Sequence, residues 1–201
     1  GMAKRTLMKD YEVQRCSKPM VAMKLKDDDE LISVVKDSER ILMVTLNGYY
    51  LNYASDELPV VGAKASGVKG ISLKEDSLKS MFTFNNLVEY VTVFTDSKTA
   101  KRVKISELES HSRAKKGSLL FKKMKTVTYR VLNALGTNSR DLILTKADSD
   151  IRIIKNSDIA IMDLASTGSN ISKYKLDYVG KVALKEKEEE EVKEVVEEIA
   201  V

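Results

Sequence analysis

Hydrophobic residues along the chain gather in short runs that are typical of buried β-strands. Residues 41–44 are four successive apolar positions, and residues 90–94 repeat the pattern with Val, Val and Phe close together. Strands that are apolar on successive positions pack on both faces, as they do between neighbouring sheets. Three such runs end in a threonine, at Thr45, Thr95 and Thr145, so the pattern returns every 50 residues. The sequence therefore predicts repeated β-structure.

The same succession of features follows each run. A polar turn and a second short strand come first, then an acidic residue beside an apolar one, and then a small-residue loop that ends in glycine. The acidic and apolar pairs are Glu57-Leu58, Glu107-Leu108 and Asp158-Ile159, and the glycines are Gly67, Gly117 and Gly168. The N-terminal residues enter the pattern partway, with Lys4-Arg5 matching Lys101-Arg102. We predict four units with approximate boundaries 2–51, 52–101, 102–152 and 153–185.

A period near 50 residues made of short strands predicts an all-β fold whose sheets are arranged radially, as blades around a centre. No convincing helical periodicity interrupts residues 2–185, which argues against a helical solenoid. We therefore expect one domain over residues 2–185. Its loop glycines are expected where the backbone needs positive φ or a close approach.

Residues 186–201 form a separate acidic segment. They hold eight Glu and two Lys, a net charge of 2 − 8 = −6, so residues 1–185 carry 4 − (−6) = +10. Val192, Val195, Val196 and Ile199 fall at helical spacing, which predicts a short helix with one apolar stripe. Two interpretations stay open: a terminus that solubilises or packs on a neighbour, or a regulator that competes with a polyanionic partner for the basic body.

The remaining composition excludes several kinds of site. A single cysteine, Cys16, cannot form an internal disulfide, and one histidine, His111, is too few for a Cys/His zinc site. No apolar run approaches the length of about 20 residues that spans a bilayer, so we expect no membrane partner and a cytoplasmic protein. Ser110 and Ser112 beside His111 lack a nucleophile elbow, and residues 27–29 (DDD) are expected in a turn. We predict neither a catalytic nor a metal site.

Basic residues are concentrated in the middle of the chain. Residues 98–130 contain eleven Lys and Arg against two Glu, a net charge of 11 − 2 = +9. Such a density indicates a polyanionic partner such as nucleic acid. A solvated surface is the alternative, because lysine is common on any exposed face.

Two stretches carry a specific resemblance. Residues 42–78 read LMVTLNGYYLNYASDELPVVGAKASGVKGISLKEDSL, and residues 99–117 read TAKRVKISELESHSRAKKG. They resemble the C-terminal β-pinwheel domain of the A subunit of bacterial type IIA topoisomerases, and the pattern fits every repeat from residue 2 to about residue 180. The PVVGAKASGVKGI form is more similar to topoisomerase IV of the low-GC Gram-positive type than to gyrase.

The departures from the family pattern bear on function. Gyrase is distinguished by a QRRGGKG box, whereas residues 14–20 here read QRCSKPM and keep only the opening Gln-Arg. This argues against gyrase-like chiral wrapping of DNA and favours a parent enzyme that relaxes or decatenates, with the gyrase wrapping domain as the alternative. Asn52 stands where the repeat places Arg102 and Arg5, so we expect weaker DNA contact from the second unit.

The resemblance implies a non-catalytic β-pinwheel, a propeller-like disc of about four blades that holds bent duplex DNA on a basic outer rim. By the same resemblance, the catalytic tyrosine of the parent isomerase lies outside this chain. The parts of the parent enzyme that use Mg²⁺ and ATP also lie outside it, so no cofactor is expected here. The implied partners are double-stranded DNA without sequence specificity, the rest of the A subunit and the ATPase B subunit, on the nucleoid of a bacterium. A disc that docks an acidic protein is the second class of function that we keep open.

DNA contacts are expected from basic residues that recur at matched repeat positions. They would meet the phosphates of the duplex in turn as it bends around the disc, so affinity should fall steeply with salt. These residues are Lys4, Arg5, Arg15, Lys18, Lys64, Lys69, Lys101, Arg102, Lys104, Arg113, Lys115, Lys116, Arg152 and Lys155.

Overall fold

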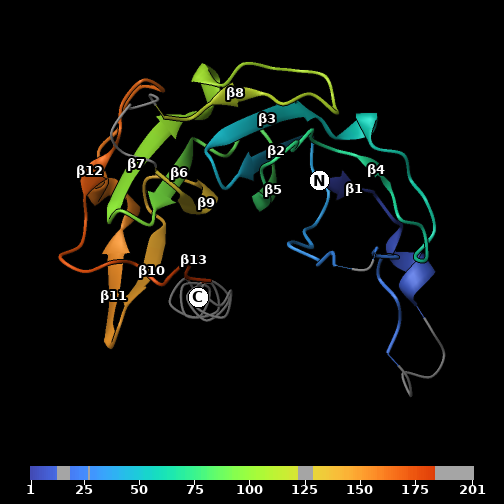
Figure 1. Ribbon diagram of the computed structural model, residues 1–201, viewed down its shortest axis with the longest axis horizontal. Coiled ribbons are helices and arrows are strands. Elements are labelled where there is room, and N and C mark those ends of the chain that lie inside the picture. Colours follow the sequence, from blue (N-terminus) through green and yellow to red (C-terminus); the bar gives the residue numbers. More distant parts are fainter. Residues whose placement is uncertain (13–18, 27, 122–128, 184–201) are drawn as a thin grey trace, which may run out of the picture.

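The computed structural model describes residues 1–12, 19–26, 28–121 and 129–183. The sheets follow one another along an open arc, with the N-terminal unit at one end and the fourth blade at the other (Figure 1). The predicted all-β fold is confirmed, since the described elements are short strands and single turns of 3-10 helix. In this part of the chain no helix is long and apolar enough to cross a membrane. The predicted tail helix lies outside the described residues.

Each of the second, third and fourth blades is built on a β-hairpin and a third strand. The hairpins are β2 (Arg40–Thr45) with β3 (Tyr49–Ala54), β6 (Tyr90–Thr95) with β7 (Thr99–Lys104), and β10 (Leu142–Ala147) with β11 (Asp150–Lys155). The third strands are β5 (Leu78–Phe84), β9 (Val131–Thr137) and β13 (Tyr178–Lys181), which pair antiparallel with β2, β6 and β10. These third strands lie on the inner side of the arc (Figure 1).

Two of the three recurring threonines, Thr45 and Thr95, end their strands at the hairpin turn, whereas Thr145 lies within β10 and its hydroxyl donates to the carbonyl of Arg152 at 3.4 Å. The Thr45 hydroxyl accepts a hydrogen bond from the backbone N–H of Tyr49 at 3.0 Å, and the Thr95 hydroxyl accepts one from Ser97 at 3.3 Å. The residue in the left-handed region of each turn is Gly48, Lys98 or Asp148, again 50 residues apart. The period found in the sequence is therefore the period of the hairpins.

The fourth strand of a blade comes from the next unit along the chain. The two-residue strands β4 (Val68–Lys69), β8 (Ser118–Leu119) and β12 (Ser169–Asn170) pair antiparallel with β1 (Met2–Ala3), β3 and β7. The sheet orders are β1-β4, β5-β2-β3-β8, β12-β7-β6-β9 and β11-β10-β13. Backbone pairing therefore ties each blade to its neighbour.

The predicted unit boundaries do not coincide with the sheets. The boundaries at 51/52 and 101/102 fall inside β3 and β7, and the one at 152/153 falls inside β11. A sequence period determines the length of a unit but leaves its starting point free. The observed pairing instead places each hairpin with the strand that follows it, and places the hairpins of the second and third blades also with a short strand from the next unit.

The loop glycines are required by backbone conformation and by close approach, as predicted. Gly67, Gly117 and Gly168 have φ of +78°, +81° and +86°, a region that side chains with a Cβ rarely adopt. Each also lies against a backbone carbonyl of the preceding unit, and a Cβ on Gly117 would overlap the carbonyl of Tyr50. The glycines let the short fourth strands reach the neighbouring blade.

The core lies between the blades. Alternate residues of β2 face opposite sides: Leu42 and Val44 belong to the cluster shared with the third blade, while Ile41 and Met43 belong to the cluster on the N-terminal side. A third cluster lies between the third and fourth blades. A buried apolar residue also follows each of the turns η2 (Ser55–Glu57), η3 (Ile105–Glu107) and η4 (Asn156–Asp158). These residues are Leu58, Leu108 and Ile159.

Candidate nucleic-acid interface

Lys101, one of the predicted DNA contacts, is buried between the third and fourth blades. Its side chain is 0% exposed, and its ammonium donates to the backbone carbonyls of Asp163 at 2.8 Å, Leu164 at 3.3 Å and Ser166 at 3.1 Å. Burial lowers the pKa of this ammonium to about 8. A phosphate cannot reach the Lys101 ammonium in this structure.

Arg102 is also an interior residue. Its Nε donates to the carbonyl of Ile159 at 2.6 Å and its Nη2 to the carbonyl of Ser157 at 3.1 Å, both in the fourth blade. Its backbone N–H donates to the carbonyl of Ala160 at 2.9 Å, and its guanidinium lies 4.9 Å from the centre of the Tyr90 ring. The side chain therefore serves the contact between blades.

Lys4 and Arg5 repeat this arrangement between the first unit and the second. The Lys4 ammonium donates to the carbonyls of Gly62 at 3.0 Å and Ala63 at 2.6 Å, and Arg5 Nε donates to the carbonyl of Leu58 at 2.9 Å. We call the Lys-Arg positions Lys4-Arg5 and Lys101-Arg102 the inter-blade clamps. The clamps recur in the sequence because the same packing contact recurs between units. Recurrence at matched positions is therefore no evidence by itself that a residue binds DNA.

The equivalent position in the second blade, Asn52, makes the same kind of contact with a shorter side chain. Its Nδ2 lies 3.5 Å from the carbonyl of Leu108, and its Oδ1 accepts a hydrogen bond from Arg40 Nε at 2.9 Å. The backbone carbonyl of Asn52 accepts from His111 at 2.7 Å. Asn52 is 4% exposed, so the residue at this position says nothing about how strongly the second blade contacts DNA.

A second set of predicted residues is brought together at the junction of the second and third units. We call Lys69, Arg113, Lys115 and Lys116 the junction cluster. The guanidinium of Arg113 donates to the carbonyl of Lys69 at 2.6 Å, and the backbone carbonyl of Lys115 accepts from the N–H of Ser72 at 2.9 Å. Lys69, Lys115 and Lys116 are exposed, and Arg113 is half-buried. Four cations therefore lie on two segments that are hydrogen-bonded to each other.

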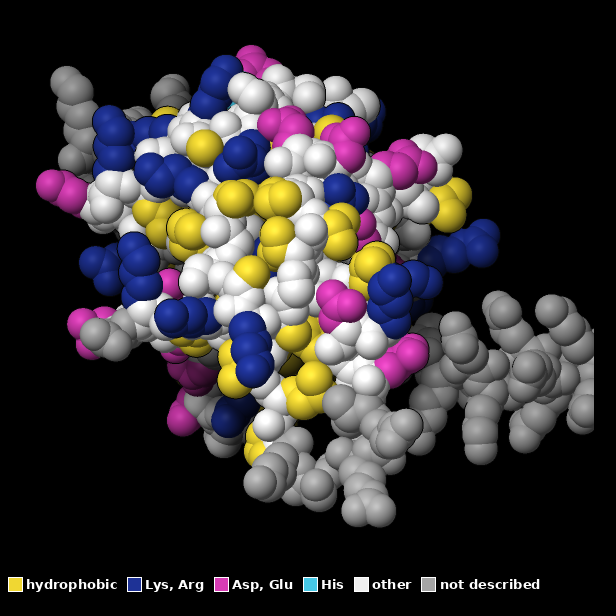
Figure 2. All heavy atoms as spheres, turned by 90° about the vertical axis from the view of Figure 1, so that its right-hand side faces the viewer, with side chains coloured by type: hydrophobic (Ala, Val, Ile, Leu, Met, Phe, Trp, Pro, Cys, Tyr) yellow, Lys and Arg dark blue, Asp and Glu magenta, His cyan; other side chains and the backbone are white. Residues whose placement is uncertain are grey.

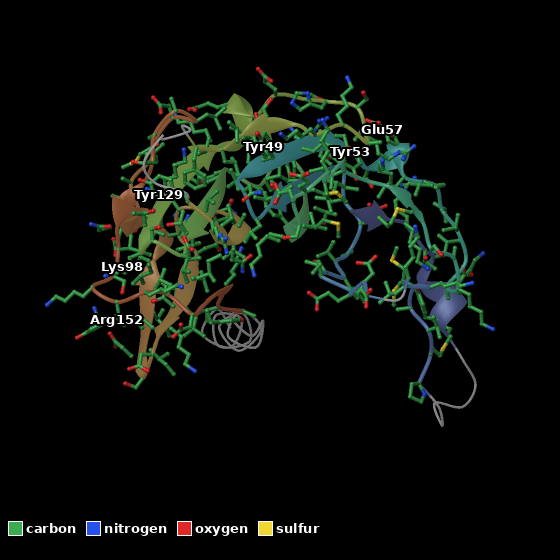
Figure 3. All side chains as sticks on the ribbon, viewed as in Figure 1. Tyr49, Tyr53, Glu57, Lys98, Tyr129 and Arg152 are labelled. Carbon is green, nitrogen blue, oxygen red and sulfur yellow. The ribbon has the colours of Figure 1, made fainter. Side chains whose placement is uncertain are left out.

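The backbone under the junction cluster is held at several points. Glu57 accepts a hydrogen bond from the N–H of Arg113 at 2.7 Å, and Gly70 accepts one from Ala114 at 2.8 Å. The Lys116 ammonium lies 3.9 Å from the centre of the Tyr49 ring. Figure 3 shows Tyr49 and Glu57 along β3 and the turn that follows it, on the outer side of the arc.

Lys64 lies beside two exposed lysines that the repeat alignment did not select. The backbone N–H of Lys24 donates to the carbonyl of Ala65 at 3.4 Å, which brings Lys24 and Lys26 next to the loop that carries Lys64. Figure 2 shows basic side chains over this side of the molecule. Lys24 and Lys26 were not among the predicted DNA contacts, and the backbone hydrogen bond to Ala65 is what associates them with this loop.

The remaining predicted residues are separate from the junction cluster. Lys104 and Lys155 are exposed immediately before η3 and η4, and Arg152 is exposed and paired with Asp150 at 2.7 Å. Residues 161–168, which form the fourth-unit loop, contain no Lys or Arg. Arg15 and Lys18 lie outside the described residues. Across the described ranges, no group of three or more His, Cys, Asp or Glu side chains is placed to hold a metal ion.

Sequence comparison gives a consistent set of relatives. A family model described as the DNA gyrase C-terminal domain, a β-propeller, matches residues 1–36, 39–85 and 89–126. The A subunit of DNA topoisomerase 4 from Bacillus subtilis (strain 168) is 38% identical over 173 residues, which cover 84% of this chain and 21% of that protein. Its counterpart from Streptococcus pneumoniae serotype 4 is 33% identical over 193 residues, 86% of this chain and 23% of that protein. The chain thus spans under a quarter of the length of these relatives.

Solved structures agree with the fold. The C-terminal domain of DNA topoisomerase IV superposes with a TM-score of 0.87 at 32% identity, covering 98% of this chain and 64% of that one. The DNA gyrase A C-terminal domain superposes with a TM-score of 0.71 over 82% of this chain and 58% of that one. At 21% identity, the second match shows the likeness of fold alone.

Proposed function

The chain belongs to the family of DNA gyrase C-terminal domains, which are β-propellers, and on this basis we propose that it holds duplex DNA for the A subunit of a topoisomerase IV. The similarity to topoisomerase 4 proteins from two organisms supports the choice of parent enzyme. In this proposal the chain is non-catalytic. Strand breakage, with Mg²⁺ and ATP, takes place in other parts of a cytoplasmic enzyme that includes the B subunit.

The junction cluster is the observation that carries the proposal. Lys69, Arg113, Lys115 and Lys116 present four cations on two loops that are hydrogen-bonded to each other. Phosphate contacts from such a surface bind duplex DNA without reading its sequence, because base edges are read in the grooves by an inserted element. Four contacts would give log affinity a slope of about −3.6 against log salt, at about −0.9 for each phosphate.

The distribution of exposed cations suggests a path for the duplex. The loop of the second unit carries Lys64 and has Lys24 and Lys26 beside it, and the junction cluster follows at the boundary with the third unit. The fourth-unit loop has no basic residue. We therefore place the duplex along the first three units. Because bending a short duplex costs several kcal/mol, flexible or already crossed DNA is expected to bind better.

The proposal is tested by binding a duplex of about 40 base pairs over a salt series, with fluorescence anisotropy as the readout. The double variant Lys115→Ala and Lys116→Ala removes two phosphate contacts, so its slope should be shallower by about 1.8. The matched control is Lys173→Ala with Lys175→Ala, which removes the same charge from exposed positions of the fourth blade.

The control separates a local contact from an effect of net charge. We expect the slope of the control to remain within about 0.3 of the wild type, because no phosphate contact is lost. Equal losses in the two double variants would contradict a specific path. Absence of DNA binding at low salt would contradict the proposal and favour an acidic protein as the partner of the junction cluster.

The gyrase alternative differs in the topology that the domain imposes. A gyrase-type domain wraps DNA chirally, so it would change the linking number of a relaxed plasmid that is closed by ligase in its presence. We expect no change in the mean linking number with this chain. A reproducible shift of one sign would favour gyrase-like wrapping.

A further inference from the structure

The loop that carries three members of the junction cluster differs from its counterparts in the second and fourth units. Ala114 has a φ of +66°, in the left-handed region, whereas the matched residues Lys64 and Ala165 lie outside that region. A residue with a Cβ adopts this conformation at a cost, so the surrounding contacts must hold it there. The conformation of the third-unit loop therefore depends on what binds it next to Ala114.

The lysine that holds the other two loops is missing from this one. The ammonium groups of Lys4 and Lys101 donate to backbone carbonyls of the second-unit and fourth-unit loops, at residues 62 and 63 and at residues 163, 164 and 166. The matched residue of the second blade is Leu51, which is buried and has no donor on its side chain. The third-unit loop must therefore be held in another way.

Glu57, at the end of η2, holds the third-unit loop beside Ala114. Its carboxylate Oε2 accepts a hydrogen bond from the backbone N–H of Arg113 at 2.7 Å, and the carbonyl of Gly70 accepts one from the N–H of Ala114 at 2.8 Å. The Arg113 guanidinium completes the link by donating to the carbonyl of Lys69 at 2.6 Å. Figure 3 shows Glu57 on the outer side of the arc, beyond Tyr53 of β3.

The charges of Glu57 and Arg113 also meet at one buried hydroxyl. Burial raises the pKa of Tyr53, while the positive charge of Arg113 lowers it and the negative charge of Glu57 raises it. Glu57 is half-buried, whereas Asp56, the preceding residue of η2, is exposed. The two acids of this turn therefore have the same charge and different surroundings.

Two lysines of the junction cluster follow directly after the left-handed residue. The carbonyl of Lys115 accepts a hydrogen bond from the N–H of Ser72 at 2.9 Å, and the Lys116 ammonium lies 3.9 Å from the centre of the Tyr49 ring. The backbone turn at Ala114 sets the direction in which the chain continues into both residues. What fixes this turn therefore also fixes where the two ammonium groups are presented.

We propose that Glu57 is a positioning residue for DNA binding, which holds Arg113 and the turn after it so that Lys115 and Lys116 face the duplex. By its charge alone, a carboxylate beside a phosphate-binding surface weakens binding. In this role Glu57 strengthens binding, because cations that are already in place need not be ordered when the duplex binds. The inference rests on the proposed function and specifies how the junction cluster is built.

The test repeats the salt series on the full chain with three variants. Glu57→Ala removes the acceptor for Arg113, so we expect weaker binding and a slope shallower by about 0.9 to 1.8, the loss of one or two phosphate contacts. Glu57→Gln keeps a side-chain oxygen in place without the charge, so its slope should match that of wild type. Asp56→Ala is the matched control, since it removes the same charge from an exposed position of the same turn. It should bind at least as tightly as wild type.

The slope distinguishes positioning from a general loss of stability. Partial unfolding lowers the apparent affinity by the same factor at every salt concentration, whereas a displaced cation changes the number of phosphate contacts and hence the slope. A wild-type slope for Glu57→Ala would overturn the proposal. Equal effects of Glu57→Ala and Asp56→Ala would also overturn it, as would a Glu57→Gln variant that is impaired as much as Glu57→Ala.

Amide hydrogen exchange without DNA tests the positioning by itself. We expect the amides of Arg113 and Ala114 to exchange faster in Glu57→Ala than in wild type or Glu57→Gln, because the hydrogen bond to the carboxylate is lost. Unchanged exchange would overturn the proposal even if wild type binds DNA. Faster exchange together with a wild type that does not bind DNA would support the positioning of the loop and overturn the proposed function instead.

Discussion

The guanidinium Nε of Arg102 donates a 2.6 Å hydrogen bond to the carbonyl oxygen of Ile159, across the boundary between the third and fourth blades. Arg5 makes the matching bond to Leu58 at 2.9 Å. Ile159 and Leu58 are both nearly fully buried, so their surroundings offer few other donors for these carbonyls. A residue type that suggested DNA binding therefore holds the blades together.

Replacing Arg102 with alanine should destabilise the protein. The carbonyls of Ile159 and Ser157 lose their side-chain donor, and at the buried Ile159 an unsatisfied acceptor costs about 1 to 3 kcal/mol. We expect a clear fall in the urea midpoint followed by circular dichroism. Arg102→Asn should lose less, because Asn52 occupies the equivalent position in the second blade. A weaker salt dependence of DNA binding with unchanged stability would instead indicate a phosphate contact.

Gly117 should tolerate no side chain. Its φ is +81°, and a Cβ would overlap the carbonyl of Tyr50 on β3. Gly117→Ala should therefore lower the free energy of unfolding by about 2 to 4 kcal/mol, from the strained backbone and the displaced strand. The control is Gly62→Ala, where a Cβ would meet no atom within 4 Å and φ is outside the left-handed region. Equal effects of the two changes in urea unfolding would contradict the close-approach explanation.

Lys101 should make stability depend on pH in the alkaline range. Its pKa is lowered by burial to about 8, whereas the ordinary lysine value is 10.5. Between these values the unfolded chain binds the proton and the folded protein releases it, so the free energy of unfolding rises with pH across this window. Lys101→Met should remove that part of the rise and also lower stability at pH 7, because three carbonyls lose their donor. Urea titrations at pH 7 to 10 measure both effects, and parallel pH profiles for the two proteins would contradict the assignment.

The acidic segment 186–201 lies outside the described residues, and the hypothesis that it regulates DNA binding rests on its charge alone. If its net charge of −6 competes with DNA for the basic body, deletion of 186–201 should tighten binding of the duplex at low salt. A full-length variant in which four of the eight glutamates are changed to glutamine should fall between wild type and the deletion. Unchanged affinity in both would favour the interpretation of the segment as a solubilising terminus.

The sequence determined the repeat and the fold class because both depend on local pattern. Thr45 and Thr95, 50 residues apart, end apolar runs and accept hydrogen bonds in the hairpin turns, and Gly117 and its counterparts occupy left-handed positions that favour glycine. Apolar residues on both faces of β2 follow from packing between two neighbours. These features need no knowledge of which residues meet across the fold.

The division of the basic residues between packing and binding was decided by the tertiary structure. Lys101 and Lys116 are both lysines of the third unit, yet the next blade places carbonyls around Lys101 and leaves Lys116 exposed over Tyr49. A cation can be satisfied by carbonyl oxygens or by phosphates, and its spacing along the chain is the same in either case. Only the position of the neighbouring blade determines which oxygens lie within reach, because that position depends on the strand pairing between units rather than on any one segment of the sequence.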